Sequence, residues 1–130
     1  MADPTEQVEN SILHDVKQIV GQEWDDTTFD LDIKTHINSV FADLEQIGVG
    51  PKDGFEITDH TQLWDEYLLG NVKLNSVKSY IYIRVRLLFD PPATGPLAQS
   101  LQAQADKWEW RLMVQTDPPL PNSTVGVVND

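Results

Sequence analysis

The stretch Val72 to Pro92, VKLNSVKSYIYIRVRLLFDPP, decides the fold of this 130-residue chain. Its residues 80–87, YIYIRVRL, alternate as a half-buried strand would. However, the apolar run from Val72 to Phe89 contains no turn signal and is too long for a typical strand. Asp90 precedes a proline, which disfavours helical geometry at that residue and ends the element. We therefore predict a helix that is buried on most of its sides.

Three further segments show apolar residues at helical spacing. Asn10 or Ser11 can cap the first helix and Gly21 can end it. Thr27 with Asp30 resembles a capping box for the second. The predicted stripes are Ile12, Val16, Ile19 and Val20; Ile33, Ile37, Val40, Phe41, Leu44 and Ile47; and Leu97, Leu101, Ala105, Trp108 and Leu112.

The connections complete the prediction of an all-α fold, a four- to five-helix bundle with a long Gly-rich loop and an extended C-terminal tail. Residues 48–60 contain three glycines and one proline, and a loop of this length is often functional. Within it, 55–57 could pair as a short strand. A short helix is expected over 61–69, closed by Gly70. Trp24 and Phe29 are the expected anchors of the first linker.

The last fourteen residues cannot continue the final helix because they contain three prolines. We therefore divide the chain into a helical domain, residues 1–116, and an extended tail, residues 117–130. The tail is either a disordered terminus or, through TVGVV at 124–128, a strand that adds to the sheet edge of a partner.

Composition supports a folded core and excludes several classes of protein. The hydrophobic content is 40 %, and the absence of cysteine excludes disulfides and cysteine-based metal or redox sites. The N-terminal MADPTEQVEN has no apolar core of a signal peptide. No segment reaches the roughly 18 uninterrupted apolar residues of a membrane span. We expect neither a secretory signal nor membrane association.

The negative charge lies almost entirely in the first half of the chain. Residues 1–70 hold 16 acids and 3 bases, a balance of −13, and residues 71–130 have a balance of +1, which together give the net −12. Binding of nucleic acid relies on clustered Lys and Arg, so this pattern argues against it. The charge serves either solubility or a surface that must lie near DNA without binding it.

No motif indicates catalysis, so we expect neither an enzyme nor a cofactor. His14, His36 and His60 lack the spacing of metal ligands and are interpreted as ordinary surface histidines. No phosphate loop, nucleophile elbow or dinucleotide fingerprint occurs. Arg84 and Arg86 fall on the buried helix. Within one chain, each either reaches the surface with its aliphatic stem packed or pairs with an acid, and the alternative is that they pair with acids of a neighbouring subunit.

Two blocks, INSVFADLEQIGVGP and LNSVKSYIYIRVRLLFDPP, carry a resemblance, together with the GFEI loop, WDEYL and KWEWRL. Over residues 11–116 the chain resembles the head–tail connector, or adaptor, proteins of long-tailed bacteriophages. The resemblance implies a structural virion protein, made in the host cytoplasm, that forms a ring, usually of about twelve copies, below the portal. Such a ring extends the DNA channel and binds a stopper or tail-completion protein. DNA passes through it without specific binding.

The resemblance also gives three groups of residues an expected role. The loop contacts the channel or the next protein, the arginines contact neighbouring subunits, and the tail docks on the portal. An alternative function is an acidic helical inhibitor or DNA mimic that binds a basic partner. The expected contacts are Pro51, Lys52, Asp53, Phe55 and Glu56 for the loop; Arg84, Arg86 and Arg111 for subunits; and Pro118, Pro119, Leu120, Val125, Val127 and Val128 for the portal.

Overall fold

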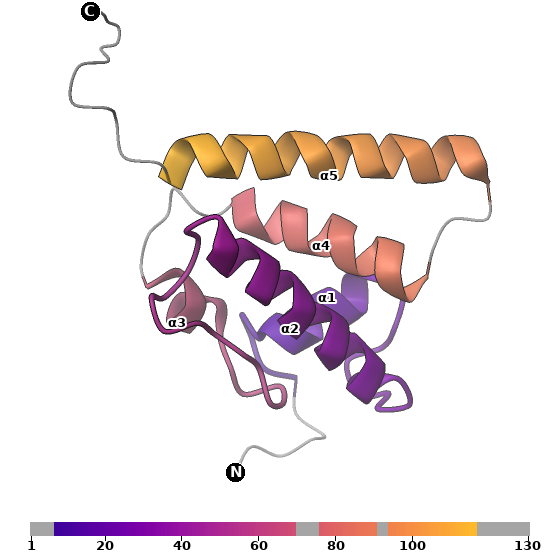
Figure 1. Cartoon of the computed structure of the whole chain (residues 1–130). Coiled ribbons are helices and arrows are strands. Elements are labelled where there is room, and N and C mark those ends of the chain that lie inside the picture. Colours follow the sequence, from indigo (N-terminus) through magenta and orange to yellow (C-terminus); the bar gives the residue numbers. More distant parts are fainter. Residues whose placement is uncertain (1–6, 70–75, 91–93, 117–130) are drawn as a thin grey trace, which may run out of the picture.

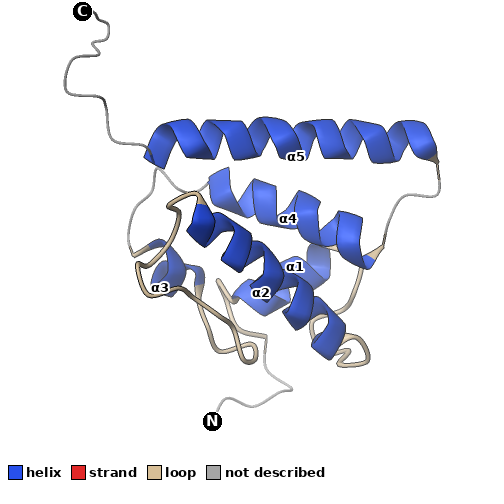
Figure 2. Ribbon diagram, viewed as in Figure 1, coloured by secondary structure: helices blue, strands red, loops and turns tan. Residues whose placement is uncertain are grey.

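The computed structural model describes residues 7–69, 76–90 and 94–116 of the chain. These residues form helices and no strand, which confirms the all-α prediction (Figure 2). None of these helices is both long enough and apolar enough to cross a membrane. The described helices are α1 (Ile12–Ile19), α2 (Asp30–Gln46), α3 (Trp64–Leu68), α4 (Ser76–Phe89) and α5 (Gly95–Thr116).

Helix α4 is the centre of the packing, as its apolar sequence predicts. It lies between α5 on one side and α1 and α2 on the other (Figure 1). Val77, Ile81 and Val85 are fully buried, and only Arg86 and Leu88 are exposed along the helix. Residues 80–87 are helical throughout, so the strand alternative is wrong. The first residues of the predicted helix, 72–75, lie outside the described part of the chain.

Helix α1 begins where the sequence predicts. The Oγ atom of Ser11 accepts a hydrogen bond of 3.2 Å from the backbone N–H of His14, and Gly21 follows the helix with a φ of 87°. The predicted stripe is wrong at one position, because Ile19 is 45 % exposed. Lys17 is buried in its place, only 1 % exposed.

Helix α2 buries its predicted stripe from Ile33 to Leu44, while Ile47 just beyond it is half-buried. Its predicted capping box is wrong. Asp30 is the first helical residue, and no side chain caps the helix. The carboxylate of Asp26 instead accepts a hydrogen bond of 3.0 Å from the N–H of Thr28 in the preceding turn.

One predicted element is absent from the described chain, and another is shorter than expected. Residues 55–57 pair with no strand in the described chain, and α3 covers only part of 61–69. Its last helical residue is Leu68 and its C-cap is Leu69, a non-glycine residue with a φ of 54°, while Gly70 lies outside the described residues. At the start of α3, the carboxylate of Glu66 accepts a hydrogen bond of 3.0 Å from the N–H of Leu63.

Helix α5 runs along α4 in the opposite direction (Figure 1). Ala105 and Leu112 of its predicted stripe are buried, whereas Leu97, near its start, is 45 % exposed. Because one layer of contacts covers only one side of a helix, the remaining faces of α5 are open to solvent.

Candidate interaction surfaces

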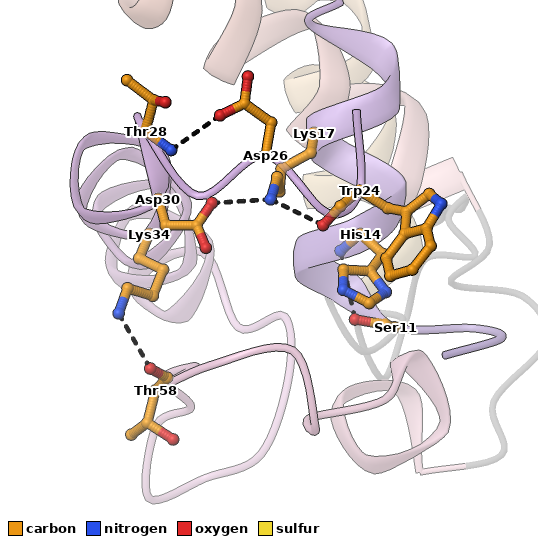
Figure 3. Close-up of polar contacts among 9 residues, drawn as sticks. All are labelled: Ser11, His14, Lys17, Trp24, Asp26, Thr28, Asp30, Lys34 and Thr58. Carbon is orange, nitrogen blue, oxygen red and sulfur yellow. Dashed lines mark hydrogen bonds and ion pairs between the residues drawn. The ribbon is translucent and has the colours of Figure 1, made fainter. Parts of the chain in front are cut away.

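Side chains of α2 form hydrogen bonds with the backbone of the Gly-rich loop, residues 48–60, in place of the bonds that a neighbouring strand would make. Asn38 accepts a hydrogen bond of 2.8 Å from the N–H of Ile57 and donates one of 3.0 Å to its carbonyl oxygen. Lys34 donates a bond of 3.2 Å to the carbonyl oxygen of Thr58 (Figure 3). These contacts satisfy the backbone of an extended segment and hold its position on the bundle.

An aromatic cluster fixes the other half of the loop. The ring of Phe55 lies against Phe41 of α2 and Tyr67 of α3, with centroids 5.4 Å and 5.3 Å away. Gly50 packs so closely on this cluster that a Cβ atom there would lie 2.8 Å from Cε1 of Tyr67. Burial raises the pKa of Tyr67, so its hydroxyl stays neutral. Phe55, an expected contact residue, is therefore an internal anchor of the loop.

The other expected loop contacts lie on the surface. Lys52, Asp53 and Glu56 are exposed, and Pro51 is half-exposed. Asp53, Glu56 and Glu45 of α2 line a hollow of about 330 Å³ between the loop and α2. The exposed edge of the loop is thus predominantly acidic, as expected for a surface that avoids phosphate.

Arg84 is committed to a polar network inside its own chain. Its guanidinium lies 2.8 Å from the carboxylate of Asp43 on α2 and also donates a hydrogen bond to the hydroxyl of Tyr80. That hydroxyl donates in turn to Glu109 of α5 over 3.0 Å, and burial raises the pKa of Tyr80 to about 12. The network joins three helices, which supports the intrachain interpretation of Arg84.

The two remaining arginines are open to contact by other molecules. Arg86 is exposed on α4, and Arg111 is exposed on α5, where its guanidinium lies 5.2 Å from the ring centroid of Trp108. Their expected role between subunits stays a prediction.

Sequence reasoning missed a buried polar cluster under the first linker (Figure 3). The Nζ atom of Lys17 lies 2.8 Å from Oδ1 of Asp30 and donates a hydrogen bond of 2.9 Å to the carbonyl oxygen of Trp24. The ring of His14 lies against Trp24, 5.7 Å between centroids, and stacks on His60 at 5.1 Å. His14 is only 4 % exposed, so its assignment to the surface is wrong.

The environment of His14 favours its neutral form. Burial, followed by the proximity of His60 and Lys17, lowers its pKa from 6.5. Its Nδ1 atom accepts a hydrogen bond of 3.1 Å from the N–H of Val8, which requires an unprotonated nitrogen at that position. The third histidine, His36, lines a separate groove with Phe29 and Phe89. No three potential ligands among the described residues are placed to hold a metal ion.

The six expected portal contacts of the tail, Pro118, Pro119, Leu120, Val125, Val127 and Val128, lie outside the described residues. Their role stays a prediction.

Among the comparisons with known proteins, the family search agrees with the resemblance. A family model described as phage connector protein matches residues 12–119. The match covers most of the chain, and the chain therefore belongs to the phage connector protein family. Searches of curated proteins and of solved structures found no match. The family is structural rather than enzymatic and gives the chain a role as a connector among the head and tail proteins of a phage virion.

Proposed function

We propose that the chain is the subunit of a ring, of about twelve copies, that lies below the portal, joins the capsid to the tail and extends the DNA channel. The observation that carries this proposal is the match to the connector family over residues 12–119. The distribution of charge supports it, because an acidic first half with exposed loop acids disfavours binding of DNA phosphate. The genome can therefore slide along such a surface.

In this proposal the Gly-rich loop faces the channel or the stopper protein. Its exposed edge is held by the Asn38 bonds and by the aromatic cluster of Phe41, Phe55 and Tyr67. A loop anchored at several points presents Lys52, Asp53 and Glu56 in a fixed arrangement, which lowers the entropic cost of binding. Residues 117–130 dock on the portal, and repetition around the ring multiplies a weak contact per copy.

Cosedimentation with the portal tests this assignment. We expect the full chain to cosediment with the portal at a fixed ratio of several copies per portal ring. The truncated chain, residues 1–116, should remain folded but should not bind the portal. Normal binding by the truncated chain would show that the tail is not the portal contact. No binding by the full chain would contradict the proposed function itself. Tight binding of either form to duplex DNA would contradict the role of the acidic surface.

A further inference from the structure

Helix α5 carries a second strip, apolar except for one lysine, on the side that faces away from the buried stripe. Ala103, Lys107, Trp110 and Val114 follow the 4-3-4 spacing of one helical face, and all four are exposed. Trp110 is 65 % exposed and Val114 is 55 % exposed. Tryptophan is enriched among the residues that dominate binding at protein interfaces. We name these four residues the outer strip.

A groove with matching apolar character lies where the first linker meets the end of α4. Its volume is about 430 Å³, and its lining includes Val20, Phe29 and Phe89. The rings of Phe29 and Phe89 meet edge to face, 5.5 Å between centroids. Leu31, 73 % exposed, and Leu88, 43 % exposed, extend the apolar area at this end of the molecule. We name this feature the end groove.

The two surfaces carry opposite charge. The stretch 20–33 that borders the end groove contains five acids and no base. One of the acids, Asp30, is paired with Lys17, whereas the others are exposed. On α5, Lys107 lies within the outer strip and Arg111 flanks it, both exposed. The neighbouring acid Glu109 is turned inward to Tyr80, and Asp106 accepts a hydrogen bond from Gln102. The exposed acids of this stretch are Glu23, Asp25, Asp26 and Asp32, and Asp90 after α4 is a further exposed acid that lines the groove.

The outer strip and the end groove lie at opposite ends of the molecule. Trp110 and Val114 belong to the end of α5 that lies beside the start of α4, as the bond from Tyr80 to Glu109 shows. The groove is lined by Phe89, the last residue of α4, and therefore lies at the far end of that helix. A helix of 14 residues is about 20 Å long, and Figure 1 shows that the end of α4 points away from the end of α5. One chain cannot therefore cover its own strip with its own groove. Two unlike surfaces at opposite ends produce head-to-tail contacts, which form a ring when the rotation from copy to copy closes on itself.

We propose that the outer strip of α5 in one subunit docks into the end groove of the next copy of this chain. Trp110 and Val114 pack on Phe29 and Phe89, while Lys107 and Arg111 lie against the acids of the first linker. This inference rests on the proposed ring and identifies the two surfaces that build it. It also gives a function to apolar side chains that the fold of a single subunit leaves in solvent.

Because the chain contains no cysteine, cross-linking can test this contact directly in the full chain mixed with its portal. A chain carrying Leu31→Cys and Val114→Cys should give a ladder of covalent oligomers with a short bismaleimide. A chain carrying Gln46→Cys and Val114→Cys is the matched control, because Gln46 is exposed at the other end of α2, about 15 Å along the helix from the groove residue His36. We expect little cross-linking in this control. Equal ladders from the test variant and the control variant would overturn the proposed contact. The absence of a ladder from the test variant in assembled rings would overturn it as well.

Substitution of the indole gives a second, independent measurement. Trp110→Ala should weaken association between copies about 30-fold, the effect of losing an interface hot spot, and leave the thermal midpoint unchanged. Gln104→Ala, an exposed change on the same helix outside the strip, should have no effect. Rings that form normally with Trp110→Ala on the portal would refute the inference and leave the connector function intact. Failure of the unmodified chain to assemble on the portal would instead refute the proposed function, and the inference with it.

Discussion

The most informative stability test is the substitution Lys17→Met, which keeps the aliphatic stem and removes the buried charge. Lys17 is 1 % exposed, and its ammonium contacts Asp30 at 2.8 Å and the carbonyl oxygen of Trp24 at 2.9 Å. Removing one partner of a buried ion pair typically costs about 3–5 kcal/mol. Asp30 is 24 % exposed, so water can partly solvate its carboxylate, and we expect a smaller loss of about 2–3 kcal/mol.

A loss of this size is a large fraction of the about 5–15 kcal/mol that stabilises an ordinary domain. It should lower the thermal midpoint by about 10 °C in a domain of this length. Urea unfolding, followed by tryptophan fluorescence, measures the free energy of unfolding directly. Lys52→Met is the matched control, because this lysine is exposed on the Gly-rich loop, and it should change the stability by less than about 0.5 kcal/mol.

The companion substitution Asp30→Asn separates loss of the pair from loss of packing. In the double variant with Lys17→Met no unpaired charge remains, so the two single losses should not add, and a coupling of about 1 kcal/mol or more is expected. A Lys17→Met variant as stable as the control, or strict additivity in the double variant, would refute the view that this buried pair holds the first linker against α1.

Three further results are expected. Gly50→Ala should lose about 2–4 kcal/mol in urea unfolding, because it combines a positive φ with a 2.8 Å approach to a tyrosine ring. Gly21→Ala, which has a similar φ but open space around its Cβ, should lose only about 1–2 kcal/mol, and equal losses would argue against the close contact. Asn38→Ala should increase amide exchange at Ile57 by at least about tenfold, since the partly buried hydrogen bond from its N–H to the Asn38 side chain is lost; unchanged exchange would show that the loop does not depend on Asn38. Because the pKa of His14 is lowered, the folded chain binds fewer protons than the unfolded chain below pH 6.5. The thermal midpoint should therefore decrease as the pH is lowered from about 7.5 to about 5.5. His14→Asn, which retains an acceptor for the N–H of Val8, should flatten this dependence, and an equally steep profile would exclude His14 as its source.

Spacing along the chain was sufficient to predict the helices that form the core. The apolar positions of α2 from Ile33 to Leu44 and those of α4 from Val77 to Val85 are buried as expected. Both helices receive neighbours on several sides, so any strongly apolar face finds a partner. The ends of helices were less predictable. Asp90 before a proline ends α4 as expected, whereas local hydrogen bonds between Asp26 and Thr28 replace the expected cap of α2.

The buried polar cluster could not be predicted from local pattern. Lys17 is buried because its charge meets Asp30 and the carbonyl oxygen of Trp24, which belong to later segments of the chain. His14 is buried because the distant His60 stacks on its ring. Such burial depends on the tertiary arrangement and not on helical periodicity. The only signal in the sequence was a lysine between Val16 and Val20, next to the apolar stripe.

The residues that were expected to contact other molecules fall into two groups, one exposed on the surface and one packed inside the subunit. The loop residues Lys52, Asp53 and Glu56 are exposed, and their role in contacts stays a prediction. Phe55 and Arg84 are engaged inside the subunit. Aromatic and arginine side chains occur both at interfaces and within packed networks, and their sequence position does not separate the two. The outer strip of α5 was not predicted from the sequence. Trp108 and Trp110 are close in sequence, but Trp108 is half-buried against the core and Trp110 is exposed to solvent.

Assembly of this chain as a ring on the portal can be seen by electron microscopy of the purified chain mixed with its portal. We expect an additional ring of density below the portal, coaxial with its channel, containing several copies of this chain. Bare portal particles beside small, separate particles of the chain, at concentrations well above those of the portal, would contradict it.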